Sequence, residues 1–118
     1  MLYLDRPNRV YIFLEPVDFR KQIDGLCALV QAEFGEGPFE DAWYLFLSRD
    51  KKKVKLLYWR GTGFALWLFR LERDIFQLGI VRQKGQLQIS WSSLHKFLNG
   101  DSLFEAKPHA PFSPKRFS

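Results

Sequence analysis

Few residues in this chain of 118 residues are of types that could perform catalysis, and their spacing does not bring them together in one site. A two-metal nuclease or transposase centre needs acidic groups that converge on ions about 4 Å apart. Asp18 and Asp24 lie six positions apart on one expected helix, about 240° out of phase, so that helix cannot bring them together. Asp41 and Asp50 are expected in loops. A small nuclease is therefore the least favoured reading, and we expect no enzyme.

Metal, cofactor and nucleophile sites also lack their usual patterns. His95 and His109 have no cysteine or carboxylate at ligand spacing. The segment Gly61-Thr-Gly63 lacks the third glycine of a dinucleotide loop, because Leu66 stands at that position. Cys27 falls on an apolar helical stripe and is expected to be a buried small hydrophobe. We expect no metal and no cofactor.

Positive charge is concentrated in the middle of the chain. Residues 49–84 hold 10 Lys/Arg and 3 Asp/Glu, a net of +7, whereas residues 1–48 hold 4 and 8, a net of −4. The densest run is Arg49 to Lys53, followed by Lys55, at the expected tip of a hairpin. Such a ribbon could follow a phosphate backbone. Equally, it could be a solvated hairpin whose lysines protect a sheet edge from aggregation.

A second pair of cations, Arg20 and Lys21, is expected in the first turn of a helix. Cations there oppose the helix dipole, and two of them beside free N–H groups would form a phosphate seat. The plainer alternative, which we favour, pairs Arg20 with Asp18 and Asp24 and leaves Lys21 solvated. The full set of candidate DNA-binding residues is Arg20, Lys21, Arg49, Lys51, Lys52, Lys53, Lys55 and Arg60.

Aromatic residues gather near the same cations. Tyr58, Trp59, Phe64, Trp67 and Phe69 are flanked by arginines, and such a cluster can stack unpaired bases. More often it forms part of a core with arginines at its rim, and we favour that reading.

The first half of the chain shows a strand, a helix and a hairpin. Residues 9–14 are β-branched and aromatic, which predicts a strand. An apolar stripe at helical period predicts a long helix over 19–34, with Asp18 as its N-cap and Gly35 as its end. Gly25 inside that helix indicates that something packs closely there. Residues 43–47 and 54–59 predict a β-hairpin.

The second half is less regular. RGTG at 60–63 is a turn signal, and the apolar segment 64–72 after it fits both a helix and a strand; we favour the helix. Residues 86–91 alternate as a half-buried strand. Ser90 or Ser92 then caps a short helix that ends at Gly100.

These elements predict one α+β domain over residues 1–106, with a mainly antiparallel sheet, one long helix and one or two short helices. Residues 107–118 form a basic, proline-rich tail. With 47% hydrophobic and 17% aromatic residues, the composition excludes intrinsic disorder. No apolar run nears the roughly 20 residues of a membrane span. The absence of a signal-peptide pattern and the single cysteine predict a cytoplasmic protein.

Two blocks of the chain resemble a known family. VDFRKQIDGLCALV (17–30) and KLLYWRGTGFALWLFRLERDIF (55–76) are similar to the conserved blocks of the TnpB-type, or Orf2-like, accessory proteins of the insertion-sequence sixty-six transposon family. SWSSLHKFLNG (90–100) resembles the closing short helix of that family. The matching signature positions are Asp18, Arg20, Lys21, Asp24, Gly25, Leu26, Trp59, Gly61, Gly63, Arg70, Leu71 and Glu72. The chain departs from the family at Arg60, at Phe69 and at Asp74-Ile75.

The resemblance implies a small bacterial accessory protein of DNA transposition, encoded beside a separate transposase that carries the catalytic carboxylates. We expect it to bind DNA at the ends of the element, the transposase, or both. The alternative is a pure protein–protein module that assembles the transposition complex without binding DNA. A homo-oligomer is compatible with either reading.

Overall fold

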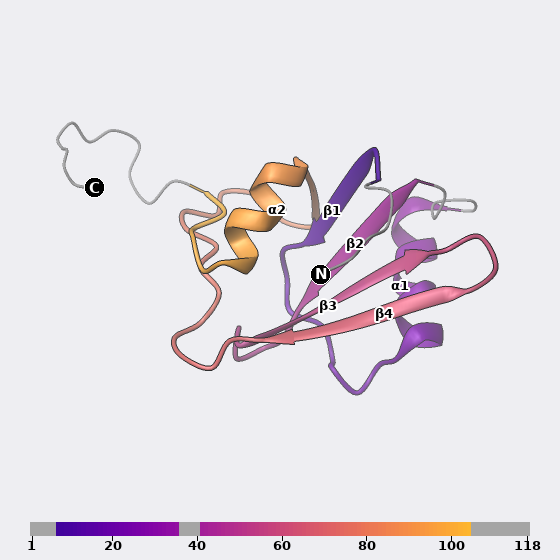
Figure 1. Cartoon of the computed structure of the whole chain (residues 1–118), viewed down its shortest axis with the longest axis horizontal. Helices are drawn as coiled ribbons and strands as arrows, with labels where there is room; N and C mark the ends of the chain where they lie inside the picture. Colours follow the sequence, from indigo (N-terminus) through magenta and orange to yellow (C-terminus); the bar gives the residue numbers. More distant parts are fainter. Residues whose placement is uncertain (1–6, 36–40, 105–118) are drawn as a thin grey trace, which may run out of the picture.

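The computed structural model of the chain describes residues 7–35 and 41–104. Its centre is a five-stranded sheet with strand order β4-β3-β2-β1-β5. The strands are β1 (Arg9–Phe13), β2 (Ala42–Leu47), β3 (Lys53–Trp59), β4 (Phe64–Arg70) and β5 (Gln86–Ile89), and the helices are α1 (Ile23–Phe34) and α2 (Trp91–Leu98). Figure 1 shows α1 and α2 on opposite sides of the sheet. The predicted α+β class is confirmed. Neither helix in the described part of the chain has the length and apolarity that a membrane crossing requires.

The sheet is mostly antiparallel, as predicted, but it contains one parallel pair. β1 and β2 run parallel, with α1 as the crossover between them, and β5 pairs antiparallel with the other side of β1. Parallel neighbours need a long connection, which the helix supplies. The sequence reading did not foresee this pair.

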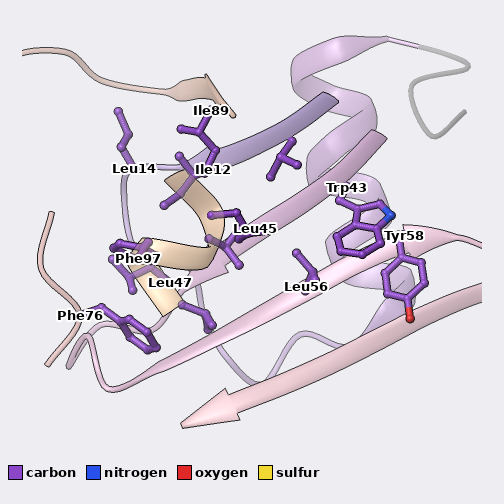
Figure 2. Close-up of a cluster of buried hydrophobic side chains, with 13 residues drawn as sticks. Ile12, Leu14, Trp43, Leu45, Leu47, Leu56, Tyr58, Phe76, Ile89 and Phe97 are labelled. Carbon is purple, nitrogen blue, oxygen red and sulfur yellow. The ribbon is translucent and has the colours of Figure 1, made fainter. Parts of the chain in front are cut away.

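Each face of the sheet carries its own apolar cluster, because side chains alternate along a strand. One face gathers Leu26 and Val30 of α1 with Tyr44, Phe46 and Leu57 of the strands. On the other face, Leu94 and Phe97 of α2 lie with core residues that Figure 2 shows as sticks. There Phe76 and Phe97 stack at 5.1 Å between ring centroids, and Trp43 stacks on Tyr58 at 4.8 Å.

The segment 64–70 is a strand, so the helix that we favoured for it is wrong. β4 pairs with the full length of β3, from Trp59 opposite Phe64 to Lys53 opposite Arg70. The predicted turn over 60–63 joins the two strands, with Gly61 at a positive φ of 94° and the Arg60 amide donating to the Gly63 carbonyl. Ala65, Trp67 and Phe69 pack on the core of the α2 side. A strand that is apolar on both faces loses the alternation by which strands are recognised.

The long helix is also shorter than predicted. α1 begins at Ile23 and not at residue 19, and its N-cap position, Gln22, makes no side-chain capping bond. Asp18 instead closes a tight turn, in which its carbonyl accepts from the Lys21 amide at 3.0 Å. Arg20 and Lys21 are therefore outside the helix, and the argument from a helix dipole does not apply. The helix does end at Gly35, as predicted.

The close packing at Gly25 and the serine cap of the second helix are confirmed. The close approach expected at Gly25 is present, since a Cβ there would lie 3.2 Å from both Cβ and Cγ of Lys21. The second helix is capped by Ser90, whose hydroxyl accepts from the Ser93 amide at 3.0 Å. The predicted tail, residues 107–118, lies outside the described residues.

Candidate nucleic-acid interface

The turn in front of α1 and the loop between β2 and β3 lie side by side and enclose a cleft. Val17 pins the first segment to the end of β2, because its amide donates to the Leu47 carbonyl at 3.0 Å. The cleft has a volume of about 520 Å³. Its walls are Val17, Asp18, Phe19, Arg20, Ser48, Arg49, Asp50 and Lys53. Two basic segments more than 25 residues apart in the sequence thus meet at one end of the sheet.

Arg20 is held in place by Asp18. The Asp18 carboxylate accepts from the Arg20 backbone amide at 2.9 Å, from Nε at 3.1 Å and from the terminal guanidinium nitrogen at 2.7 Å. These bonds from Arg20 hold the pKa of Asp18 well below its usual range. The Arg20 side chain is 91% exposed, so it is oriented but open to solvent. The pairing with Asp18 that we favoured is confirmed.

Lys55 has a structural role, and its burial argues against the phosphate contact that we predicted for it. It is only 5% exposed, and its ammonium donates to the carbonyls of Phe19 at 2.9 Å and Lys21 at 2.8 Å. The ammonium also lies 4.8 Å from the centre of the Phe19 ring, a cation–π contact. Burial lowers the pKa of Lys55. Lys55 therefore joins the turn in front of α1 to β3 through two buried hydrogen bonds.

The loop between β2 and β3 is ordered by its own side chains. Asp50 Oδ1 accepts from the Ser48 hydroxyl at 2.7 Å and from the Lys52 amide at 3.0 Å. The Ser48 hydroxyl in turn accepts from the Lys53 amide at 3.0 Å. These hydrogen bonds, the one from Ser48 foremost, lower the pKa of Asp50. The predicted hairpin is confirmed, with a loop whose backbone positions its lysines.

This loop is braced from behind by the segment that follows β4. The Leu71 amide donates to the Lys52 carbonyl at 2.9 Å, and the Phe76 amide donates to the Lys51 carbonyl at 2.7 Å. Arg70 lies opposite Lys53 in the β3–β4 ladder. The Nε of Arg70 lies 3.0 Å from a carboxylate oxygen of Glu72. The tip of the hairpin is thus packed against a neighbouring segment and forms part of a fixed surface.

We call this surface the basic end. It consists of Arg20, Arg49, Lys51, Lys52, Lys53 and Arg70, drawn from three segments of the chain. Arg20, Arg49, Lys52 and Arg70 are exposed, while Lys51 and Lys53 are half-buried. Asp18, Asp50 and Glu72 lie among these cations and reduce their charge. The arrangement offers several cations to an extended anion.

Arg60 does not belong to the basic end. It follows the opposite end of β3, seven residues from Lys53, which corresponds to about 23 Å along a strand. Lys21 lies beside the basic end, but its stem is packed against Gly25. Arg70 was not among the predicted DNA-binding residues, and reading 64–70 as a strand would have placed it beside Lys53.

Both family blocks named above contribute to this end of the molecule. Asp18, Arg20 and Lys21 form the turn, and Leu26 anchors α1 in the core with no exposed surface. Leu71 bonds to the loop and Arg70 pairs with Glu72 beside it, while Trp59, Gly61 and Gly63 lie at the far turn. Asp24 and Gly25 lie in the first turn of α1. Across the described parts of the chain, no three His, Cys, Asp or Glu side chains are grouped as metal ligands.

Comparisons with known proteins agree with this reading of the blocks. The family model described as IS66 Orf2 like protein matches residues 8–108. An uncharacterized protein, y4jC, from Sinorhizobium fredii (strain NBRC 101917 / NGR234) is 31% identical over 71 residues, or 58% of this chain. The match spans 61% of the length of that relative. No solved structure matches the chain significantly.

Proposed function

Because the chain belongs to the IS66 Orf2-like family of transposition-associated accessory proteins, we propose that it serves transposition by binding DNA through its basic end. The observation that carries the proposal is that Arg20, Arg49 and Lys53 line one cleft, with Lys51 and Lys52 in the same braced loop and Arg70 opposite Lys53. A nucleic-acid backbone is a row of phosphates, and lysine and arginine contacts to it supply affinity without reading sequence.

The way in which the cations are held supports the same proposal. Arg20 is fixed by Asp18, and the backbone carrying Lys51, Lys52 and Lys53 is fixed by Asp50, Ser48 and the segment behind it. A preorganised surface loses less conformational entropy on binding than a flexible one. The bases need not be contacted for such binding, so any preference for the ends of the element would come from a partner or from DNA shape.

In this proposal the catalytic carboxylates belong to the separate transposase of the same element. The chain holds its DNA or presents it to that enzyme and performs no bond cleavage itself. The transposase is a second proposed partner.

A second candidate function is a module that only joins proteins. The carboxylates of Asp18 and Asp50 inside the cleft favour it, since they lower the attraction for phosphates. So does Leu68 on β4, which is 61% exposed and could contact a protein. This module would bind the transposase tightly and DNA weakly.

The experiment that separates the two functions is binding of the purified protein to a labelled duplex of about 20 base pairs, by fluorescence anisotropy, at increasing salt. DNA binding through four or five phosphates predicts that log affinity falls against log salt with a slope of about −4. Duplexes with the terminal repeats of the element and with scrambled sequence are compared at each salt concentration. No binding at about 50 mM salt would contradict the DNA proposal, and capture of the transposase would then support the protein module.

A further inference from the structure

The two edges of the sheet differ in length and in chemistry. β5 has four residues, two of them glutamines, so it offers a short and polar edge. β4 has seven residues, and from Phe64 to Phe69 it carries neither a charge nor a proline. Figure 1 shows β4 as the outermost strand, and no strand of the described chain lies beyond it. A long apolar edge that lacks the usual protective residues is a template for another strand.

The hydrogen bonds at the two ends of the β3–β4 ladder show which backbone groups face outward. The Leu71 amide donates to Lys52, and the Arg60 amide donates to Gly63, so residues of odd number on β4 bond to β3. The amide and carbonyl groups of Leu66 and Leu68 therefore point away from β3. Their side chains lie on the α1 side, where Leu68 is the most exposed of the large hydrophobic residues that the structure describes.

We propose that this edge pairs with β4 of a second copy of the chain, antiparallel and centred on Trp67. In this register Leu66 lies opposite the partner's Leu68, and Phe64 lies opposite the partner's Arg70. Leu66 and the partner's Leu68, whose amide and carbonyl groups face outward, exchange two hydrogen bonds. Leu68 then covers the partner's Leu66 instead of remaining in water.

Symmetry and strand length both favour this register. A two-fold axis perpendicular to the sheet keeps each side chain on its own face, and directly opposed side chains share a face. One residue of β4 must therefore lie directly opposite its own copy, with the axis between them. Centring on Trp67 uses all seven residues of β4. Because both chains use the same edge about this axis, head-to-tail growth is closed off.

The dimer has a consequence for the basic end. Because the axis is perpendicular to the sheet, both copies of α1 lie on one side of a continuous ten-stranded sheet. In the β3–β4 ladder Lys53 pairs with Arg70, and Lys55 pairs with Leu68 two residues further along. The side chains of Lys55 and Leu68 are on the α1 side, so those of Lys53 and Arg70 are on the same side. Both basic ends therefore open toward the same side. The dimer itself does not depend on whether that surface binds DNA.

The test is sedimentation equilibrium of the full chain over a wide concentration range. The wild type is expected at twice the mass of one chain, and Leu68→Lys is expected to raise the dimer dissociation constant at least tenfold. Val81→Lys is the matched control, because Val81 is also an exposed hydrophobic residue, at 41%, but lies away from β4. Circular dichroism checks that each variant is folded.

Disulfide cross-linking tests the register separately. In a Cys27→Ser background, the double variant Leu66→Cys/Leu68→Cys is expected to form an intermolecular disulfide on oxidation, and neither single variant is expected to do so. A monomeric wild type, an assembly larger than two, or a dimer that Leu68→Lys leaves unchanged would overturn the proposal. A dimer in which the double variant does not cross-link, or in which either single variant does, would overturn the register.

Discussion

The ammonium of Lys55 donates a hydrogen bond to the carbonyl of Phe19 at 2.9 Å, across 36 positions of sequence. This bond and its companion to Lys21 join β3 to the turn that carries Arg20. One cation of the basic run is thus buried so that others can be held in place. The basic run in the sequence, residues 49–55, and the basic end in the structure are therefore different sets of residues. The basic end lacks Lys55 and gains Arg20 and Arg70.

Replacing Lys55 by methionine tests this structural role. The Lys55→Met variant keeps most of the stem but leaves two carbonyls without their donor, which should cost about 1–3 kcal/mol of unfolding free energy. Urea denaturation measures the loss. Lys53→Met, at a half-buried position on the same strand, is the control and should change stability by less than about 0.5 kcal/mol. Equal losses of unfolding free energy in the two variants would show that the hydrogen bonds of Lys55 do not stabilise the turn.

The lowered pKa of Asp18 predicts how the stability of the protein depends on pH. The pKa of Asp18 is lower in the folded protein than its usual 3.8. Its contribution to the free energy of unfolding is therefore complete above pH 3.8 and is lost as the pH falls toward the pKa of the folded state. Thermal melts from pH 5 to pH 2 should show a smaller decline for Asp18→Asn than for the wild type. The difference should shrink at high salt, since the pair with Arg20 is exposed. Parallel curves for the two proteins would contradict the pairing.

Gly79 should tolerate no side chain. It has a φ of +79°, and a Cβ there would lie 2.2 Å from the Phe104 carbonyl oxygen. Gly85 has a similar φ of +84° with nothing within 4 Å of its Cβ position. Gly85→Ala therefore measures the conformational cost alone, about 1 kcal/mol or more. Gly79→Ala should cost clearly more by thermal melting, and equal costs would show that Phe104 does not pack there.

Much of the fold could be predicted because the signals are local. The hairpin at 43–59, the turn at 60–63 and the Ser90 cap each depend on residues within a few positions of one another. The parallel pairing of β1 with β2 depends on residues 33 positions apart, such as Arg9 and Ala42, and no local pattern encodes it.

The errors arose where a distant contact outweighs a local preference. Asp18 is a good N-cap by type, but Lys55 binds the carbonyls of Phe19 and Lys21 and holds that segment as a turn. β4 reads equally well as a helix until its pairing with β3 is known. For the candidate site, charge density predicted the loop at 49–53 but could not show that Lys55 points inward or that Arg70 lies beside Lys53.

The central claim, that the basic end binds DNA, is tested most directly by charge reversal with a matched control. Lys51→Glu/Lys52→Glu/Lys53→Glu should weaken binding to a short duplex at least tenfold at low salt and flatten the salt dependence. Arg82→Glu/Lys84→Glu/Lys96→Glu makes the same change in net charge at exposed positions elsewhere and should weaken binding much less. Circular dichroism confirms that both variants are folded. Equal affinity of the first variant and the wild type, or equal losses in the two variants, would contradict the account.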